Sequence, residues 1–494
     1  MGHKGAPARL ATRLSVLAVL ALAACKGPEP GPADQREKAV GTAQPTSGAT
    51  LSGIMPLDVQ LVLNPGIGPN DQVRIRPNFD DFSWQSFVAL AWPVDPALRG
   101  SPRNPTDPNT LLGAGNAYAS VWSSYRDAND LYPGAKPDRP VPFDAPATSG
   151  CGSGAGLVLV KNSKMGDPLS DTQQAFSLPL VDQSRNYVYY QMLFNRDQYD
   201  FVRGSDSDPT TWLYRKTALF NAEKVAPIGM PQANADTKVQ GAMMLKAAWK
   251  QLTKQDDASR YYTRQAQIQD PATGKCGAPT TVGLIGLHIA HKLSDFPQWV
   301  WSSFEHVDNV PPASGPAPRR MTLNNGTNIP PVNGDGFANA PASSTPVQDP
   351  IPVQVVRMNP IPTTPAKVSG QQYPSGAGST ADLNAAYQAL LKGSVWANYQ
   401  LVITQWPFNA VPQNRFKPPE KQGVYPGDAG GAFPLYGAVN TSMETYFQTQ
   451  RAALGAGGNS CMQCHYQAGM TDFSWSLKLR SQNPKTTAQQ RGRP

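Results

Sequence analysis

Residues 282–291 read Val-Gly-Leu-Ile-Gly-Leu-His-Ile-Ala-His, and residues 299–306 read Trp-Val-Trp-Ser-Ser-Phe-Glu-His. Branched and aromatic residues dominate both runs, as is typical of β-strands. If the two runs are neighbouring strands, they present their histidines at one end of a sheet. Similar runs predict further strands at Leu57–Leu63, Leu157–Lys161, Tyr187–Phe194, Tyr261–Ile268, Pro352–Arg357 and Asn398–Trp406, whereas residues 240–252 fit either a helix or a strand.

Three segments have helical patterns. Asp81–Trp92 and Asp382–Lys392 carry apolar residues at helical spacing. Thr441-Ser-Met-Glu444 matches a capping box, which predicts a helix running toward Leu454. The fold class that we expect is therefore α+β, with a large β-rich, loop-rich body and short helices.

The composition agrees with a folded protein that has many turns. Charged residues make up 16% of the chain, below the roughly 25% of ordinary domains, and there are 49 Pro and 43 Gly. Hydrophobic residues make up 40% and ten residues are Trp, which suffices for a sizeable core. The formal net charge of +8 includes no block of Lys or Arg, so nucleic-acid binding is not indicated.

The first 24 residues have the pattern of a signal peptide. Basic residues precede an apolar run at 14–24, which is too short to cross a bilayer, since a span takes about 20 residues. The run ends in Leu-Ala-Ala-Cys25, which resembles the lipobox of bacterial lipoproteins; the alternative is an ordinary cleavage site beside a chance cysteine. We therefore expect an exported protein that is lipid-anchored through Cys25 to the periplasmic face of a membrane or to the cell surface.

The remaining chain divides into four parts by composition. Residues 25–54 are rich in Pro, Gly and small polar residues, which is typical of a flexible tether. Residues 55–379 are expected to form the β-rich body, with a Pro/Gly-rich loop at about 310–350. Residues 380–480 are expected to form a segment of helix and strand, and residues 481–494 a disordered tail.

Residues 461–465 read Cys-Met-Gln-Cys-His, a spacing at which a peptide bonds haem covalently. The thiols of Cys461 and Cys464 add across the two haem vinyl groups, and His465 then coordinates the iron. One alternative is a zinc half-site, for which no further ligands stand nearby in the sequence. Another is a redox dithiol, for which the Gly-rich approach lacks a strand-to-helix context. We therefore predict one covalent haem c.

Through these five residues the chain resembles c-type cytochromes, and more loosely their large single-haem lipoprotein members. In small cytochromes c the motif lies near the start of the domain, and a distant Met binds the opposite side of the iron. Here only residues 466–494 follow the motif, and Met470 is the sole Met among them. The resemblance therefore implies a small helical C-terminal haem-attachment segment, unlike a standard small cytochrome c domain, with a pocket built mainly from upstream residues.

Two cysteines remain once the others have been assigned. With Cys25 acylated and with Cys461 and Cys464 bonded to haem, a lone pair in an exported protein favours one disulfide, Cys151–Cys276. The alternative is two unrelated buried thiols.

Three histidines are candidates for the distal iron ligand: His288, His291 and His306. On a strand His288 and His291 point to opposite faces, so at most one of them faces the iron. Gly286 shares the face of His288 and leaves room for a flat ring. We therefore rank His288 first, His291 second and His306 third, while each alone also fits a structural histidine hydrogen-bonded in the core.

The function predicted from these features is electron transfer by a membrane-tethered c-type cytochrome. Its partner is a redox protein or a small-molecule electron donor or acceptor. A haem-dependent oxidoreductase with an open distal site is the first alternative, because four hundred further residues exceed what a carrier needs. A surface binding protein with a structural or sensing haem is the second.

Overall fold

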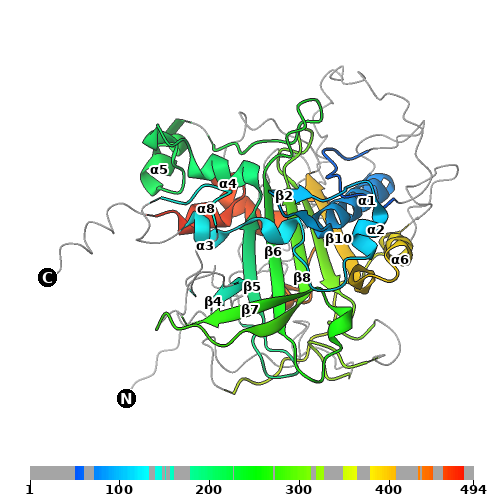
Figure 1. The fold of residues 1–494 in the computed structure, drawn as a ribbon. Coiled ribbons are helices and arrows are strands. Elements are labelled where there is room, and N and C mark those ends of the chain that lie inside the picture. Colours follow the sequence, from blue (N-terminus) through cyan, green and yellow to red (C-terminus); the bar gives the residue numbers. More distant parts are fainter. Residues whose placement is uncertain are drawn as a thin grey trace, which may run out of the picture. The chain divides into compact units, whose positions relative to one another are not determined.

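A nine-stranded, largely antiparallel sheet is the central element of the described chain (Figure 1). The computed structural model describes residues 50–60, 72–132, 139–146, 151, 156–160, 179–225, 227–270, 273–312, 319–326, 349–363, 379–407, 432–433, 437–448 and 460–482. The strand order is β11-β10-β9-β8-β6-β5-β3, with β7 paired to β8 and β4 paired in parallel to β7. The strands are β3 Arg126–Asp127, β4 Leu157–Val160, β5 Tyr189–Phe194, β6 Met243–Gln251, β7 Thr263–Gln269, β8 Thr280–His291, β9 Val300–His306, β10 Tyr399–Pro407 and β11 Ala432–Phe433, beside a separate pair, β1 Val94–Asp95 and β2 Leu98–Pro102.

Short helices accompany the sheet, and only α1 reaches 20 residues among those described. This sheet-rich body with a few short helices is the α+β class that the sequence predicts. The α-helices are α1 Gln72–Ala91, α2 Pro108–Leu112, α3 Ala128–Leu131, α4 Arg196–Arg203, α5 Lys216–Val225, α6 Thr380–Leu390, α7 Cys461–His465 and α8 Trp475–Arg480.

Helices α1 and α6 pack on one face of the sheet, which we call the α1 face. Trp84 of α1 stacks on Tyr387 of α6 with ring centroids 4.9 Å apart. The Ser83 hydroxyl lies 2.7 Å from the hydroxyl groups of both Ser302 on β9 and Thr404 on β10. Trp84 is fully buried in the main apolar cluster, so this face carries much of the core.

The opposite face of the sheet is crossed by residues 437–448, which we call the strap; we call this side the strap face. Asn440 donates through Nδ2 to the Phe304 carbonyl at 2.8 Å. Thr441 donates through Oγ1 to the fully buried carboxylate of Glu305 at 2.7 Å. Strand β9 therefore holds the strap against the sheet.

The structure confirms most predicted strands and assigns residues 243–251 to a strand, β6. Two predicted strands are not found. Of Leu57–Leu63, residues 57–60 form no strand and residues 61–63 lie outside the described ranges. Pro352–Arg357 runs irregularly, with the Val353 and Val355 N–H groups donating to two separate segments of the chain. Pro352 has no N–H to contribute, which helps to explain why this run does not form a continuous ladder.

The predicted capping box does not form. The Glu444 carboxylate accepts from the Asn440 N–H at 3.0 Å instead of the Thr441 N–H, and Glu444 is itself the N-cap of the short 3-10 helix that follows. Thr441 does not cap a helix, because its hydroxyl donates to Glu305 on β9. Within the described strap only a 3-10 turn follows, Thr445–Phe447, while the remainder of the predicted helix, from residue 449 to 454, lies outside the described residues.

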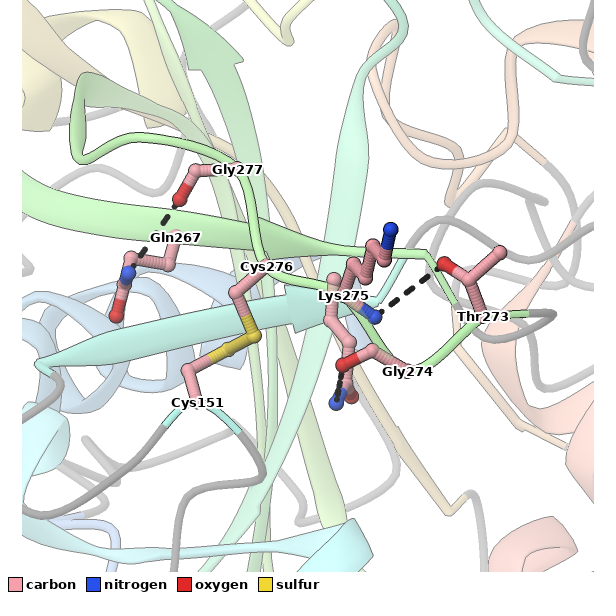
Figure 2. Close-up of a disulfide and its surroundings, with 8 residues drawn as sticks. Cys151, Gln267, Thr273, Gly274, Lys275, Cys276 and Gly277 are labelled. Atoms are coloured by element: carbon pink, nitrogen blue, oxygen red, sulfur yellow. Dashed lines mark hydrogen bonds between the residues drawn. A yellow bond between two sulfur atoms is a disulfide. The ribbon is translucent and has the colours of Figure 1, made fainter.

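The predicted disulfide between Cys151 and Cys276 is present (Figure 2). It joins the chain just before β4 to the loop just after β7, with Cα atoms 5.7 Å apart. The Gln267 side-chain amide donates to the Gly277 carbonyl at 3.3 Å beside it. The bond therefore fastens the covalent chain where β4 and β7 pair.

Several predicted segments lie outside the described residues. These are the signal peptide at 1–24 with Cys25, the tether as far as residue 49, most of the loop at 310–350 and the tail from residue 483 onward. None of the described helices has the length and hydropathy that a membrane span requires.

Candidate functional site

The Cys-Met-Gln-Cys-His motif forms the short helix α7 on the strap face. Residues three and four apart share one side of a helix, so Cys461 shares its side with both Cys464 and His465. The three side chains are half-buried. The Met462 N–H donates to Oε1 of Gln405 on β10 at 2.7 Å, and Cys461 packs against apolar residues of β10 and the strap. Strand β10 therefore positions the start of the motif.

His465 is held in one tautomer. Its Nδ1 lies 2.7 Å from the Phe473 carbonyl oxygen. A carbonyl only accepts hydrogen bonds, so Nδ1 carries the hydrogen and Nε2 keeps its lone pair. The ring packs against Trp301 of β9 with centroids 4.3 Å apart. Burial lowers the pKa of His465 to about 4, with the hydrogen bond to Phe473 opposing it, so the imidazole is neutral at pH 7.

The two motif cysteines are not joined in a disulfide. Burial, with a smaller effect from the Glu444 carboxylate, raises the pKa of Cys464 to about 11 and also raises the pKa of Cys461. Both are therefore thiols at neutral pH, whereas a redox dithiol acts as a thiolate. Among the described residues, no group of three or more His, Cys, Asp or Glu side chains is arranged to hold a metal ion.

His288 lies on the strap face, on the same side of the sheet as the motif. In the β8–β9 register it pairs with Ser303, two residues after Trp301. Its Nε2 lies 3.4 Å from Glu444 Oε2, which is within ion-pair distance when the imidazole is protonated. The charge of His288 lowers the pKa of His465, after the larger effect of burial, so the two rings are electrostatic neighbours.

The prediction that Gly286 leaves room for a flat ring beside His288 is wrong. A Cβ on Gly286 would lie 2.3 Å from Ser442 Oγ and 3.2 Å from Met443 Cε. The strap therefore fills the space that the missing side chain leaves. Gly286 admits the strap rather than a flat ring.

The other two histidines belong to buried structural sites. His291 points to the α1 face, where Nε2–H donates to the Gln240 carbonyl at 2.6 Å. His306 stacks on Tyr261 with centroids 4.1 Å apart, and Nε2–H donates to the Arg260 carbonyl. Burial lowers the pKa of both to about 4. The predicted alternation of His288 and His291 is confirmed, but the second and third candidates do not lie with the motif.

Two charged residues near the motif were missed from the sequence. Lys246 on β6 pairs with His288 in the sheet register. Burial lowers the pKa of Lys246, with Glu444 and Cys464 opposing this effect. Burial alone would raise the pKa of Glu444, but His288, Lys246 and the Asn440 N–H together lower it. The lone charge of Lys246 in the apolar run Ala-Met-Met-Leu-Lys-Ala-Ala-Trp was a signal that could have revealed it.

Met470 lies in the 3-10 helix Tyr466–Thr471 that follows the motif. It is half-buried against the main apolar cluster, and its carbonyl accepts from the Ile228 N–H at 3.1 Å. The described contacts of Met470 are thus those of a core residue.

Comparison with known proteins identifies no relative: no family model, curated protein or solved structure matches this chain.

Proposed function

We propose that this chain is an exported c-type cytochrome that transfers electrons through one covalently bound haem c. In this proposal Cys461 and Cys464 hold the haem, His465 is the proximal iron ligand, and residues 460–482 form the haem-attachment segment. Cys25 carries the lipid that tethers the protein to a membrane. The partner is a redox protein or a small-molecule electron donor or acceptor.

The hydrogen bond of His465 is the observation that carries the proposal. Histidines that bind metals usually donate their second ring N–H to a carbonyl or carboxylate, which fixes the ring and its tautomer. His465 donates to Phe473 in this way, and Trp301 covers its ring. His291 and His306 make bonds of the same kind in the core, so this bond supports the proposal because it occurs at the histidine of the motif.

The other motif residues also fit a haem. Cys461 and Cys464 stand three apart on one helix, as attachment to two positions of one flat ring requires. Both are thiols at neutral pH, the form that adds across a vinyl group. When bound, the haem supplies an iron that gains and loses one electron.

In this proposal His288 would be the second iron ligand. It lies on the face that carries the motif, and its buried Nε2 has Glu444 Oε2 as a neighbour at 3.4 Å. A second imidazole favours a lower reduction potential than a methionine sulfur does. Glu444, 3.4 Å from Nε2, favours the same direction because a nearby negative charge stabilises the oxidised iron.

The test is maturation of the full-length chain in a host that attaches haem c. We expect the intact mass to increase by one haem and the visible spectrum to be low-spin. A Cys461→Ser/Cys464→Ser variant should lose both features, whereas the matched Cys151→Ser/Cys276→Ser variant should keep them. A wild-type mass without an added haem would refute the proposal.

One observation favours an oxidoreductase as the second candidate. His288 and Glu444 form an imidazole–carboxylate pair on the motif side of the sheet. If His288 does not ligate iron, this pair is able to accept and return a proton during a reaction. A high-spin spectrum that responds to carbon monoxide or peroxide in the wild type would select this function over electron transfer.

A further inference from the structure

The carbonyl that accepts from His465 belongs to an unusual turn. Asp472 and Phe473 both have left-handed backbones, with φ of 53° and 64°. This conformation is unfavourable for most non-glycine residues, Phe473 above all, so the surrounding structure must hold it. The turn places the Phe473 carbonyl 2.7 Å from Nδ1 of His465.

A buried carboxylate holds this turn. Asp472 forms an ion pair with Lys292, and both side chains are fully buried. Asp472 Oδ2 also accepts from the Met230 N–H at 2.7 Å, and Oδ1 accepts from Trp299 Nε1–H at 3.3 Å. Lys292 directly follows β8 and Trp299 directly precedes β9, so the connection between these strands grips the turn.

Backbone strain gathers at this one place. Six non-glycine residues of the described chain have positive φ, and three of them are Trp299, Asp472 and Phe473. Trp299, with φ of 73°, stands two residues before Trp301, which packs against His465. Such clusters mark positions where the fold imposes a geometry for a purpose.

Stability alone does not explain the ion pair. Taking two charges out of water is costly, and apolar residues of similar volume often stabilise a core at least as well. The best-attested use of such a pair is to fix a register. Here it fixes the residue immediately before the carbonyl that orients His465.

We propose that Asp472, held by Lys292 and Trp299, is a positioning residue that fixes the orientation and tautomer of His465. This inference rests on the proposed role of His465 as the proximal ligand. It adds that the connection between β8 and β9 sets the ligand field of the iron through the Phe473 carbonyl.

Asp472→Asn tests the inference, because asparagine tolerates the left-handed backbone while the negative charge is lost. Asp256→Asn is the matched control, since it breaks another buried ion pair, Lys250–Asp256, with a nitrogen–oxygen distance of 2.7 Å. The double variant Lys292→Met/Asp472→Asn removes both charges and leaves no unpaired buried lysine. It can therefore still be measured if the single variant does not fold.

Two measurements are made on full-length chains. In protein without haem, the ring ¹⁵N shifts of labelled histidine report the His465 tautomer. In protein with haem, the reduction potential and the electron paramagnetic resonance spectrum report the ligand field. We expect both Asp472 variants to mix the two tautomers and to shift the potential, whereas Asp256→Asn changes only the melting temperature.

Unchanged tautomer and potential in both Asp472 variants would overturn the positioning role. A wild type that binds no haem would instead overturn the proposed function. The tautomer measurement would still decide whether Asp472 positions His465 in that case, so the two failures are distinguishable.

Discussion

The two faces of the sheet are built from the same strands, yet they hold their histidines in different surroundings. On the α1 face the Ser83 hydroxyl contacts those of Ser302 and Thr404, and the fully buried His291 donates to the Gln240 carbonyl. On the strap face the partly exposed His288 faces a carboxylate, with Nε2 3.4 Å from Glu444 Oε2. In our proposal the α1 face therefore contributes stability, and the strap face carries the groups that would hold the haem.

The largest loss of stability is expected from removing the disulfide beside β4 and β7, which belongs to neither face. The Cys151→Ser/Cys276→Ser variant should lower the free energy of unfolding by about 5 kcal/mol at most, because the bond closes a loop with a sequence separation of 125. Urea unfolding under non-reducing conditions measures this loss. An unchanged unfolding midpoint would show that the bond does not restrain the unfolded chain.

On the α1 face, Trp84→Ala should cost about 3–5 kcal/mol, because it leaves a cavity at a fully buried ring. The spectrum of the attached haem should not change. Chemical unfolding and a visible spectrum of the same sample provide the comparison. A spectral change with little loss of stability would reverse the roles that we assign to the two faces.

The pH dependence of stability tests the buried, neutral state of His291 on the α1 face. Its pKa in the folded protein is about 4, below the usual 6.5, because burial disfavours the charged ring. The unfolded chain therefore takes up the proton first, and the stabilising effect is full above pH 6.5 and declines as the pH falls toward 4. The stability advantage of the wild type over His291→Gln should shrink by roughly 2 kcal/mol between pH 7 and 4.5. Urea midpoints across that range measure it, and a constant advantage would contradict the buried neutral state.

The smallest stability effect is expected on the strap face. His288→Ala should change the free energy of unfolding by less than about 1 kcal/mol, since its side chain is partly exposed and lacks a strong hydrogen bond. The haem spectrum should nevertheless change from low-spin toward high-spin. His291→Ala is the control, for which we expect the opposite combination. An unchanged spectrum in His288→Ala would remove His288 as a ligand.

The periodicity of the sequence correctly predicted features that depend on one strand alone, such as the face to which a side chain points. The alternation of side chains along a strand placed His288 and His291 on opposite faces correctly. It could not predict the strap, because Ser442 and Met443 reach Gly286 from more than 150 residues away in the chain. Glu444 reaches His288 in the same way, although it stands only 17 residues before the motif in the chain.

The tetrapeptide Asp-Phe-Ser-Trp shows the same limit, since it occurs at 81–84 and at 472–475. The first copy lies inside α1, where Asp81 accepts from the Tyr387 hydroxyl at 2.8 Å. The second forms the left-handed turn at Asp472, and its Trp475 donates to the Cys464 carbonyl. Identical residues adopt two backbones because their tertiary partners differ, and only the second copy touches the motif.

The Cys151–Cys276 bond also has a mechanical consequence. A pulling force applied between the two ends of the chain would pass through the sulfur atoms and bypass the loop that contains β4, β5, β6 and β7. The covalent connections within that loop would therefore bear no load. If one end of the chain is attached and the other is pulled, these strands would stay in place while the segments outside the loop extend.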